Sequence, residues 1–444
     1  MITTINNKHN KLNFSNEREQ SQTCLNSAEH EKNQGRKVLN VPNLRFKEFQ
    51  GEWKELGLSE LLDFKNGLNP KPNKFGKGIK FISVMDILNN AVITYDCIKA
   101  SVDVTEKELS DFSVEKGDIL FQRSSETLED VGRANVYMDD KTSVFGGFVI
   151  RGKKKGEYDP QYFNYLLRSP FARKRIIPMG AGAQHFNIGQ EGLSKVKLHF
   201  ANIEEQKKIG NFLSLLDERI ATQNKIIDKL QSLIKGMEDN LLNNPLWEKT
   251  YLRSFMQFFS TNSLSWEQLS YDEGEIRNLH YGLIHGFQTR GINSASLPMI
   301  KNEAVPKQYT LCQVGDVAFA DASEDTGEIA KSVEFVDTIE GDTICGLHTI
   351  HGRDIKNRTV VGFKGFAFNS RYFHNQIKRL AQGTKVFSIT ANNLSSCYVY
   401  LPDLETQKAI VELLKAYEAQ LIVSRKTLKQ YEKQKQYLLR QMFI

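Results

Sequence analysis

One pattern of apolar residues constrains the fold of this 444-residue chain more than any other feature. Between residues 203 and 243, apolar side chains recur at alternating intervals of four and three residues, with one polar gap at Gln223. This spacing is the seam of a coiled coil. A helix of this length would extend roughly 60 Å at ~1.5 Å per residue. It therefore needs a partner of similar length, because no small domain could bury it.

The same pattern returns 201 residues later, and its polar gap at Ser424 matches the gap at Gln223. The helix starts also match, since Ile203–Ile209 reads IEEQKKI and Leu404–Ile410 reads LETQKAI. Acidic residues in the first turn and Pro402 before the second copy suit helix N-termini. The alternative is two unrelated amphipathic helices, each packed on its own domain. Matched register, gap and start favour two helices that pack on each other.

The seam residues that we expect in this contact are apolar or aromatic in both helices. They are Ile209, Leu213, Leu216, Ile220, Ile227 and Leu230 in the first helix, and Ile410, Leu414, Tyr417, Leu421, Leu428 and Tyr431 in the second.

The globular segment before each helix is repeated as well. Trp247–Phe258 matches Trp53–Phe64 in its Trp and its apolar positions, at an offset of 194 residues. Gly315-Asp316, followed by apolar residues, matches Gly117-Asp118 at an offset of 198. Offsets that drift this slowly towards 201 indicate a duplication with small insertions and deletions. The sequence therefore predicts two modules of one fold that act on different targets.

We expect an α+β protein with two duplicated mixed α/β domains joined by two long antiparallel coiled-coil helices, in a pseudo-two-fold arrangement. The expected parts are a disordered polar tail, a first domain, a first helix, a second domain and a second helix, at residues 1–40, 41–201, 202–243, 244–402 and 403–444. The tail is assigned on composition, since it is rich in Asn, Gln, Lys, Glu and Ser. Within the first domain, the patterns predict helical structure at the end of residues 53–64, a strand over 80–87 and a helix over 159–177.

The composition says more about the cellular environment of the protein than about its function. The net charge of +6 permits a polyanion partner without requiring one. The five cysteines are scattered and form no CxxC motif, so a reducing cytoplasm is the simplest setting. No apolar run reaches the ~18 residues of a membrane span, so we expect no membrane association.

Motifs for catalysis are weak in this chain. There is no GxxxxGK[ST] loop for ATP, and the nine histidines show no paired spacing for metal. The stretches Asp159–Tyr162 and Asn244–Trp247 are similar to the Asp/Asn-Pro-Pro-aromatic loop of amino-methyltransferases, but both lack its second Pro. The acidic residues at 126–130 with Arg133 are the nearest approach to a nuclease site, and a solvated loop explains them equally well. We therefore expect no catalytic residues and no metal.

Together these motifs resemble the specificity (S) subunit of type I restriction–modification systems. The resemblance covers residues 41–444 and depends on the duplication, the two Gly-Asp segments, the Gly-rich loops at 180–188 and 383–389, and the two helix starts. One departure is Thr406, where the family usually has Glu. Another is the long tail.

The resemblance implies that each domain reads one half of a bipartite site in double-stranded DNA. It also implies that the helices set the gap between the half-sites and dock two methyltransferase (M) subunits, which restriction (R) subunits join in the full complex. The S subunit would be non-catalytic and have no cofactor of its own. The assembled complex would be a DNA adenine methyltransferase and ATP-dependent endonuclease that uses S-adenosylmethionine, ATP and Mg through its other subunits.

Basic, amide and hydroxyl side chains in equivalent loops are the candidates for DNA contact, because Lys and Arg bind phosphates while Arg, Gln, Asn, Ser and Thr read base edges. In the first domain they are Lys71, Lys74, Lys77, Lys80, Gln122, Arg123, Ser124, Ser125, Gln184, His185 and Asn187. In the second they are Gln288, Arg290, Ser323, Thr384, Lys385 and Ser388. For each residue, a solvated loop without a partner is the alternative.

Two other functions are compatible with parts of the sequence. A coiled-coil scaffold with two protein-binding domains would use the same helices, but it would not need basic loops at equivalent places in both halves. An autonomous DNA-modifying enzyme is the least supported function, for want of a complete catalytic motif.

Overall fold

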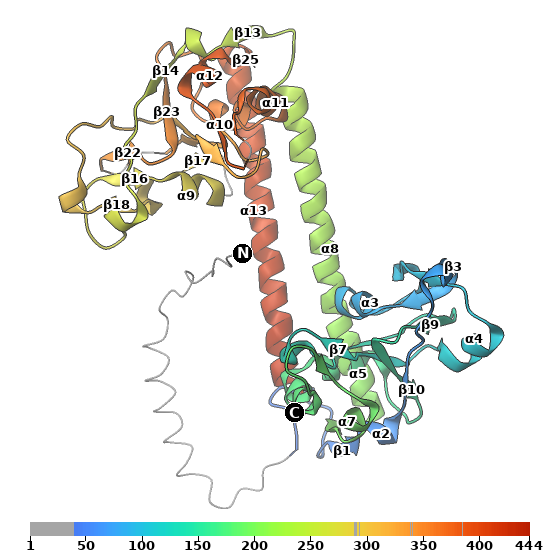
Figure 1. Cartoon of the computed structure of the whole chain (residues 1–444). Coiled ribbons are helices and arrows are strands. Elements are labelled where there is room, and N and C mark those ends of the chain that lie inside the picture. The colour runs from blue at the N-terminus through green and yellow to red at the C-terminus, as the bar shows by residue number, and fades with distance from the viewer. Residues whose placement is uncertain (1–39, 288–290, 293, 338, 340, 384) are drawn as a thin grey trace, which may run out of the picture. The chain divides into compact units, whose positions relative to one another are not determined.

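The computed structural model describes residues 40–444 except 288–290, 293, 338, 340 and 384, and Figure 1 shows the order of its elements. The described chain divides into two compact units, one formed by residues up to 217 with 433–444 and the other by residues 218–432. Each unit contains one globular domain and adjoining parts of two long helices. The expected polar tail lies outside the described residues, apart from Asn40.

The two long helices form where the heptads predict them. They are α8 (Ile203–Leu241) and α13 (Leu404–Gln441). In the second unit Gln223 Nε2 donates to the carbonyl oxygen of Ser424 at 3.1 Å, so the two polar gaps face each other. The same unit packs Leu242, just after α8, with Val411, near the start of α13. The helices of this unit are therefore antiparallel and lie side by side (Figure 1).

Much of the apolar seam is buried. The buried seam residues are Ile209, Leu213, Leu216, Ile227, Leu230, Ile410 and Leu414, and the half-buried ones are Ile220, Tyr417, Leu421, Leu428 and Tyr431. Full burial of one such side chain contributes about 1.5–3 kcal/mol. In the first unit an ion pair adds to the contact, with Lys435 Nζ 2.5 Å from Asp217 Oδ1.

The first globular domain consists of small sheets and short helices. Its sheets, in strand order, are β1 (Lys54–Gly57) with β12 (Lys197–Phe200); β2 (Leu62–Asn66), β10 (Val149–Lys154), β6 (Ile119–Gln122) and β8 (Ala134–Val136); β4 (Ser101–Val102), β3 (Phe75–Ile82), β9 (Ser143–Phe145) and β5 (Ser113–Val114); and β7 (Ser124–Ser125) with β11 (Phe186–Asn187). Its helices are α2 (Leu58–Leu61), α3 (Val84–Asn89), α4 (Glu106–Phe112), α5 (Pro160–Arg168), α6 (Pro170–Ile176) and α7 (Gln190–Ser194).

The second domain repeats this plan. Its sheets are β13 (Glu248–Tyr251) with β25 (Tyr398–Leu401); β14 (Met256–Phe259), β23 (Thr349–Asp354), β19 (Val317–Ala320), β21 (Ser332–Phe335) and β17 (Gly291–Ile292); β15 (Leu269–Ser270), β18 (Met299–Ile300), β16 (Arg277–Leu279) and β22 (Thr343–Cys345); and β20 (Ala322–Ser323) with β24 (Phe387–Ser388). Its helices are α9 (Tyr281–Gly286), α10 (Phe363–Ala367), α11 (Arg371–Leu380) and α12 (Ala391–Ser396).

The repeat extends to the register of the strands. Gly152 of β10 pairs with Ile119 of β6, and Gly352 of β23 pairs with Val317 of β19.

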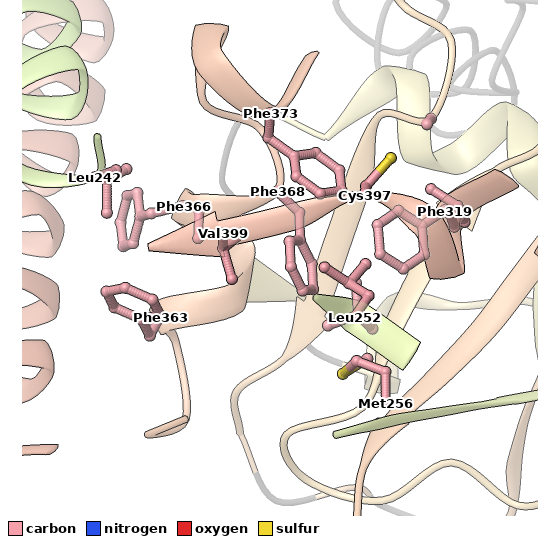
Figure 2. Packing of buried hydrophobic residues seen from close by; sticks show 14 of the residues in the cluster. Leu242, Leu252, Met256, Phe319, Phe363, Phe366, Phe368, Phe373, Cys397 and Val399 are labelled. Atoms are coloured by element: carbon pink, nitrogen blue, oxygen red, sulfur yellow. The ribbon is translucent and has the colours of Figure 1, made fainter. Parts of the chain in front are cut away.

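The core of the second domain packs aromatic rings from α10 and α11 against these strands (Figure 2). The expected fold class is confirmed: two duplicated α+β domains with two long, paired helices.

Several local predictions were wrong. The helix expected at the end of residues 53–64 is the single turn α2, and β2 already begins at Leu62. The strand expected over residues 80–87 ends at Ile82, because Ser83 caps α3 and its backbone N–H donates to Asp86 Oδ2 at 2.7 Å. The helix expected over residues 159–177 is two helices, because Pro170 has no N–H to continue α5.

One glutamine at the start of each long helix anchors it to the adjoining domain. Gln206 Nε2 donates to the carbonyl oxygen of Ala201 at 2.8 Å, and its Oε1 accepts from the backbone N–H of Asp159 at 3.0 Å. Gln407 repeats both bonds, with the carbonyl oxygen of Pro402 at 3.0 Å and the N–H of Val360 at 3.0 Å. Both glutamines are buried. The glutamine shared by the two helix starts is therefore structural.

The residue just before the anchoring glutamine differs between the two helices, because it binds different partners in the two domains. Glu205 accepts two hydrogen bonds from Arg45, each 2.7 Å long, and a third from Trp53 Nε1 at 3.3 Å. At the equivalent position Thr406 donates through Oγ1 to Asp403 at 2.8 Å, inside the first helical turn. Thr406, which departs from the family pattern, thus takes part in a local helix cap, whereas Glu205 forms an ion pair with a residue distant in the sequence.

Replacing either anchoring glutamine by Ala leaves buried backbone groups without a partner. We predict that Gln206→Ala and Gln407→Ala each lower the free energy of unfolding by about 1–3 kcal/mol. Urea denaturation followed by circular dichroism measures the change. Gln231→Ala, on the exposed surface of α8, is the matched control and should change stability by less than about 0.5 kcal/mol. Equal effects in all three variants would contradict the anchoring role.

Candidate nucleic-acid interface

The repeated Gly-Asp motif builds a buried turn in each domain. Gly117 and Gly315 have φ angles of +95° and +90°, a region that favours glycine. Asp118 accepts backbone hydrogen bonds from Glu115 and Lys154, both at 3.0 Å. Burial raises the pKa of Asp118 above its ordinary value. This carboxyl group holds the chain together and is not open to a substrate.

Asp316 occupies the same place in the second domain but has stronger partners. It lies 2.7 Å from His351 Nε2 and accepts two hydrogen bonds from Arg353, at 2.8 and 2.7 Å. Burial alone would raise its pKa, but the hydrogen bonds from Arg353 and His351 outweigh burial, and the pKa of Asp316 lies below its ordinary value. The repeated turn thus has the same backbone but different side-chain surroundings in the two domains.

Other motifs that could suggest catalysis are also structural. Asp130 forms an ion pair with Arg133 at 2.6 Å. Asp159 caps α5 by accepting from the backbone N–H of Tyr162 at 2.8 Å. Asn244 accepts in the same way from the N–H two residues further on, at 3.0 Å. The acidic loop and the methyltransferase-like stretches therefore have structural roles.

Two of the candidate clusters in each domain lie together at a strand pair. In the first domain β7 pairs with β11, so that Ser124 lies opposite Asn187 and donates to its side chain. In the second domain β20 pairs with β24, so that Ala322 lies opposite Ser388. The exposed candidates here are Gln184, His185, Asn187, Lys385 and Ser388, and the half-buried ones are Arg123, Ser124, Ser125 and Ser323. Each domain therefore presents a polar strand-end surface, formed by β7–β11 or by β20–β24.

The lysine loop is only partly available to a ligand. Lys74 pairs with Glu108 and Lys77 with Asp103, both at 3.3 Å. Lys80 Nζ donates to a backbone carbonyl at 2.6 Å. Lys71 is exposed, and the described part of the chain shows no ion pair for it.

The remaining candidates are placed differently. Gln122 is buried, and its Nε2 donates to the carbonyl oxygen of Ser124 at 2.9 Å, so it supports the strand end from inside. Gln288, Arg290 and Thr384 lie outside the described residues.

The structure adds one position in each domain that sequence reasoning missed. The backbone N–H of Arg123 donates to the carbonyl oxygen of Phe148 at 2.9 Å, and that of Asp321 donates to His348 at 3.0 Å. Phe148 is 68% exposed, which is unusual for a phenylalanine. A signal was present in the sequence, since Phe148 and His348 each follow the matched glycines, at 146 and 346, by two residues.

The two strand-end surfaces carry side chains of opposite charge at one equivalent backbone position. The first domain has Arg123, whose Nη1 donates to the carbonyl oxygen of Gly147 at 3.3 Å. The second has Asp321 at the corresponding position, with His348 Nδ1 3.1 Å from its Oδ1. Equivalent backbone positions therefore offer a donor in one domain and an acceptor in the other.

A run of rings lies beside the second strand-end surface. Trp266 and His280 have ring centroids 4.5 Å apart, His280 and Tyr281 are 4.7 Å apart, and Tyr281 and His348 are 5.3 Å apart. Burial, with a smaller contribution from His348, lowers the pKa of His280. The imidazole of His280 therefore stays neutral near pH 7 and adds no positive charge to this surface.

The long helices carry exposed apolar residues away from the seam. Phe212 on α8 and Leu413 on α13 are both exposed and occupy equivalent places in the repeat. Other exposed apolar or aromatic residues on these helices are Leu215, Ile226, Leu233, Val423 and Tyr437. Exposed apolar residues on a helix can serve as contacts for another protein where they form a continuous patch. Among the described residues no helix is long and apolar enough to cross a membrane.

Comparison with known proteins identifies relatives along most of the chain. The family described as type I restriction modification DNA specificity domain matches residues 50–232 and 346–433. The putative type I restriction enzyme MjaX specificity subunit of Methanocaldococcus jannaschii is 26% identical over 421 residues, which cover 91% of this chain and 95% of that protein. The EcoKI specificity subunit of Escherichia coli is 26% identical over 145 residues, 32% of this chain and 30% of its own.

Solved structures show the same fold. The S subunit of a type I restriction-modification system from M. genitalium aligns with a TM-score of 0.54 and 16% identity, over 91% of this chain and 99% of that chain. A chain from a structural study of type I R-M complex assembly and conformational transition aligns with a TM-score of 0.54 and 13% identity, over 87% of this chain and 96% of that chain.

Proposed function

This chain belongs to the family of type I restriction–modification DNA specificity subunits, and from that membership we propose that each of its two globular domains reads one half of a bipartite DNA site. The specificity subunit is non-catalytic, and the enzymatic activity of the complex lies in other subunits. The observation that supports two different half-sites is the pair of strand-end surfaces, which share a backbone and differ in charge. A scaffold with two protein-binding domains is not favoured by the family membership.

The chemistry of each surface suits contact with base edges. Arg123 can donate two hydrogen bonds to guanine in the major groove, whereas Asp321 can accept from the amino group of cytosine. Phe148 offers an apolar face for a thymine methyl group. Exposed Lys71 and Lys385 suit phosphate contacts, which position the protein without reading sequence.

We propose that the partners are double-stranded DNA, two M subunits and, in the full complex, R subunits. S-adenosylmethionine, ATP and Mg would then act through those other subunits. Phe212 and Leu413 support two docking sites, because equivalent apolar residues on duplicated helices can bind two copies of one partner. The cytoplasm, where such a complex meets DNA, is the proposed location.

The contact at Arg123 can be tested by substitution. Arg123→Ala should weaken binding of the complex with M subunits to its DNA by about 1–3 kcal/mol, or roughly 5–150-fold, because a base-edge contact is lost. Fluorescence anisotropy at a fixed salt concentration measures this change. Arg133→Ala is the matched control, because Arg133 is an exposed arginine of the same domain that is held by Asp130. Equal losses in both variants would remove Arg123 from the proposed contact.

Exchange of a whole domain tests the proposed function directly. Replacing residues 246–402 by the matching part of a relative should change one half of the methylated motif and leave the other half intact, because the duplicated domains read DNA separately. Sequencing of methylated adenines in cells that carry the complex reveals both halves. Changes in both halves would show that the domains read DNA jointly, and no dependence of methylation on this chain would contradict the function itself.

We also propose that the helices set the gap between the half-sites. Removal of Ile220–Ile226 and Leu421–Thr427 keeps the heptads in phase and removes both polar gap residues together. Each helix then loses ~10 Å, which corresponds to about three base-pair steps. We predict the same two half-sites with a gap shortened by about one to three base pairs, or a complex that no longer methylates.

The control for this deletion keeps helix length constant. The double variant Gln223→Leu with Ser424→Leu also removes the polar pair but should leave the methylated gap unchanged. Full methylation by the shortened chain at the original gap would contradict the gap-setting role and leave the helices as a docking surface only.

A further inference from the structure

The second domain contains a buried cluster of two cysteines and a histidine. Cys312 Sγ lies 3.6 Å from Cys345 Sγ, and a ring nitrogen of His351 lies within 4.8 Å of both sulfur atoms. The exposed fractions of the three residues are 7%, 3% and 1%. Two sulfur atoms bound to a tetrahedral zinc ion at ~2.3 Å stand about 3.8 Å apart. The sulfur atoms are therefore spaced as zinc requires, and the imidazole needs to move inward by only about 1 Å.

Strand pairing assembles the cluster from distant parts of the sequence. Leu311 forms an antiparallel bridge with Ile344 of β22, and the backbone N–H of Cys312 donates to the carbonyl oxygen of Thr343 at 2.8 Å. In this register Cys312 and Cys345 are diagonal neighbours on one face of the pair. His351 comes from β23, the next strand along the chain.

The histidine is held as a metal ligand usually is. His351 Nε2 lies 2.7 Å from Asp316, which leaves Nδ1 as the ring nitrogen free for an ion. Metal-bound histidines commonly give their second ring nitrogen to a carboxylate in this way. The charges also balance, because two thiolates neutralise a divalent ion while Arg353 neutralises Asp316. A metal ion here would therefore leave no net charge in the buried cluster.

The first domain shows that the fold does not require these side chains. At the equivalent positions of β5, β9 and β10 it has Val114, Phe145 and Arg151, and both apolar residues are fully buried. The same strand arrangement is thus stable with an ordinary apolar core. In the second domain all three positions carry groups that bind soft divalent metals.

A cavity of about 280 Å³ adjoins two members of the cluster. Cys345 and His351 line this cavity together with polar residues that include Asn262, Tyr309 and Thr310. The cavity has room for water, which commonly completes the coordination of a zinc ion with three protein ligands.

We propose that Cys312, Cys345 and His351 bind one zinc ion, with water as the fourth ligand. Each thiol gives up its proton to solvent when the ion binds, and no oxidation takes place. The ion would tie the segment around Cys312 to β22 and β23. This site is separate from the DNA-reading surfaces and does not depend on the proposed function.

Metal content of the full-length chain tests this proposal. We expect about one zinc per chain by inductively coupled plasma mass spectrometry after purification without chelators or a metal-binding tag. Cys312→Val should lose the zinc yet keep the fold, because the first domain has Val114 at the same position. Cys397→Val is the matched control, since Cys397 is also buried but lies in a different apolar cluster of the domain, and it should keep the zinc.

A second measurement decides the matter even if Cys312→Val does not fold. Cobalt(II) added to the metal-free wild-type chain should give thiolate-to-cobalt charge-transfer absorption, which zinc then displaces. A wild-type chain without zinc and without this absorption would overturn the proposal. So would zinc that persists in a folded Cys312→Val variant, or a Cys312–Cys345 disulfide found by mass spectrometry of the unreduced chain.

Discussion

A helix of nearly forty residues with one apolar seam cannot stay exposed to water along that seam, and the rest of this structure depends on how the seam is covered. Burial of the seam stabilises the helix pair, and the two polar gap residues, Gln223 and Ser424, face each other within it.

The anchoring glutamines join each long helix to its own globular domain. Gln206 and Gln407 bind backbone groups on both sides, so they fix the start of each long helix whatever side chains the domain carries. The same holds for the strand-end surfaces, where the bonds from Arg123 to Phe148 and from Asp321 to His348 join backbone atoms. Backbone hydrogen bonds do not depend on side-chain identity. The duplicated domains can therefore differ in charge and shape at these surfaces while the framework stays the same.

The sequence predicted the parts of the fold that depend on periodicity and repetition. Heptads and a slowly drifting repeat offset identify α8, α13 and the two domains, because these signals sum over many residues. The bounds of short elements were harder to predict. Those of β2 and α3 depend on single local interactions, such as the hydrogen bond from the backbone N–H of Ser83 to the side chain of Asp86. The sequence could select Ser124 and Asn187 as candidates, but their contact arises from the pairing of β7 with β11. The Cys312 cluster was hidden for the same reason, because its members follow no metal-ligand spacing and meet only through strand pairing.

Positioning of the candidate DNA contacts follows from what lies directly behind them. The backbone N–H of Ile188 donates to the carbonyl oxygen of Arg123, and that of Ile389 donates to Asp321, both at 2.9 Å. Both isoleucines are buried, so each strand end is tied to an apolar core one residue away from its exposed polar groups. In the proposed function, a surface held in this way would lose little conformational freedom when DNA binds, and more of the contact energy would remain for discrimination between bases. In the proposed function, the short strand pairs β7–β11 and β20–β24 would fix where each domain meets its half-site.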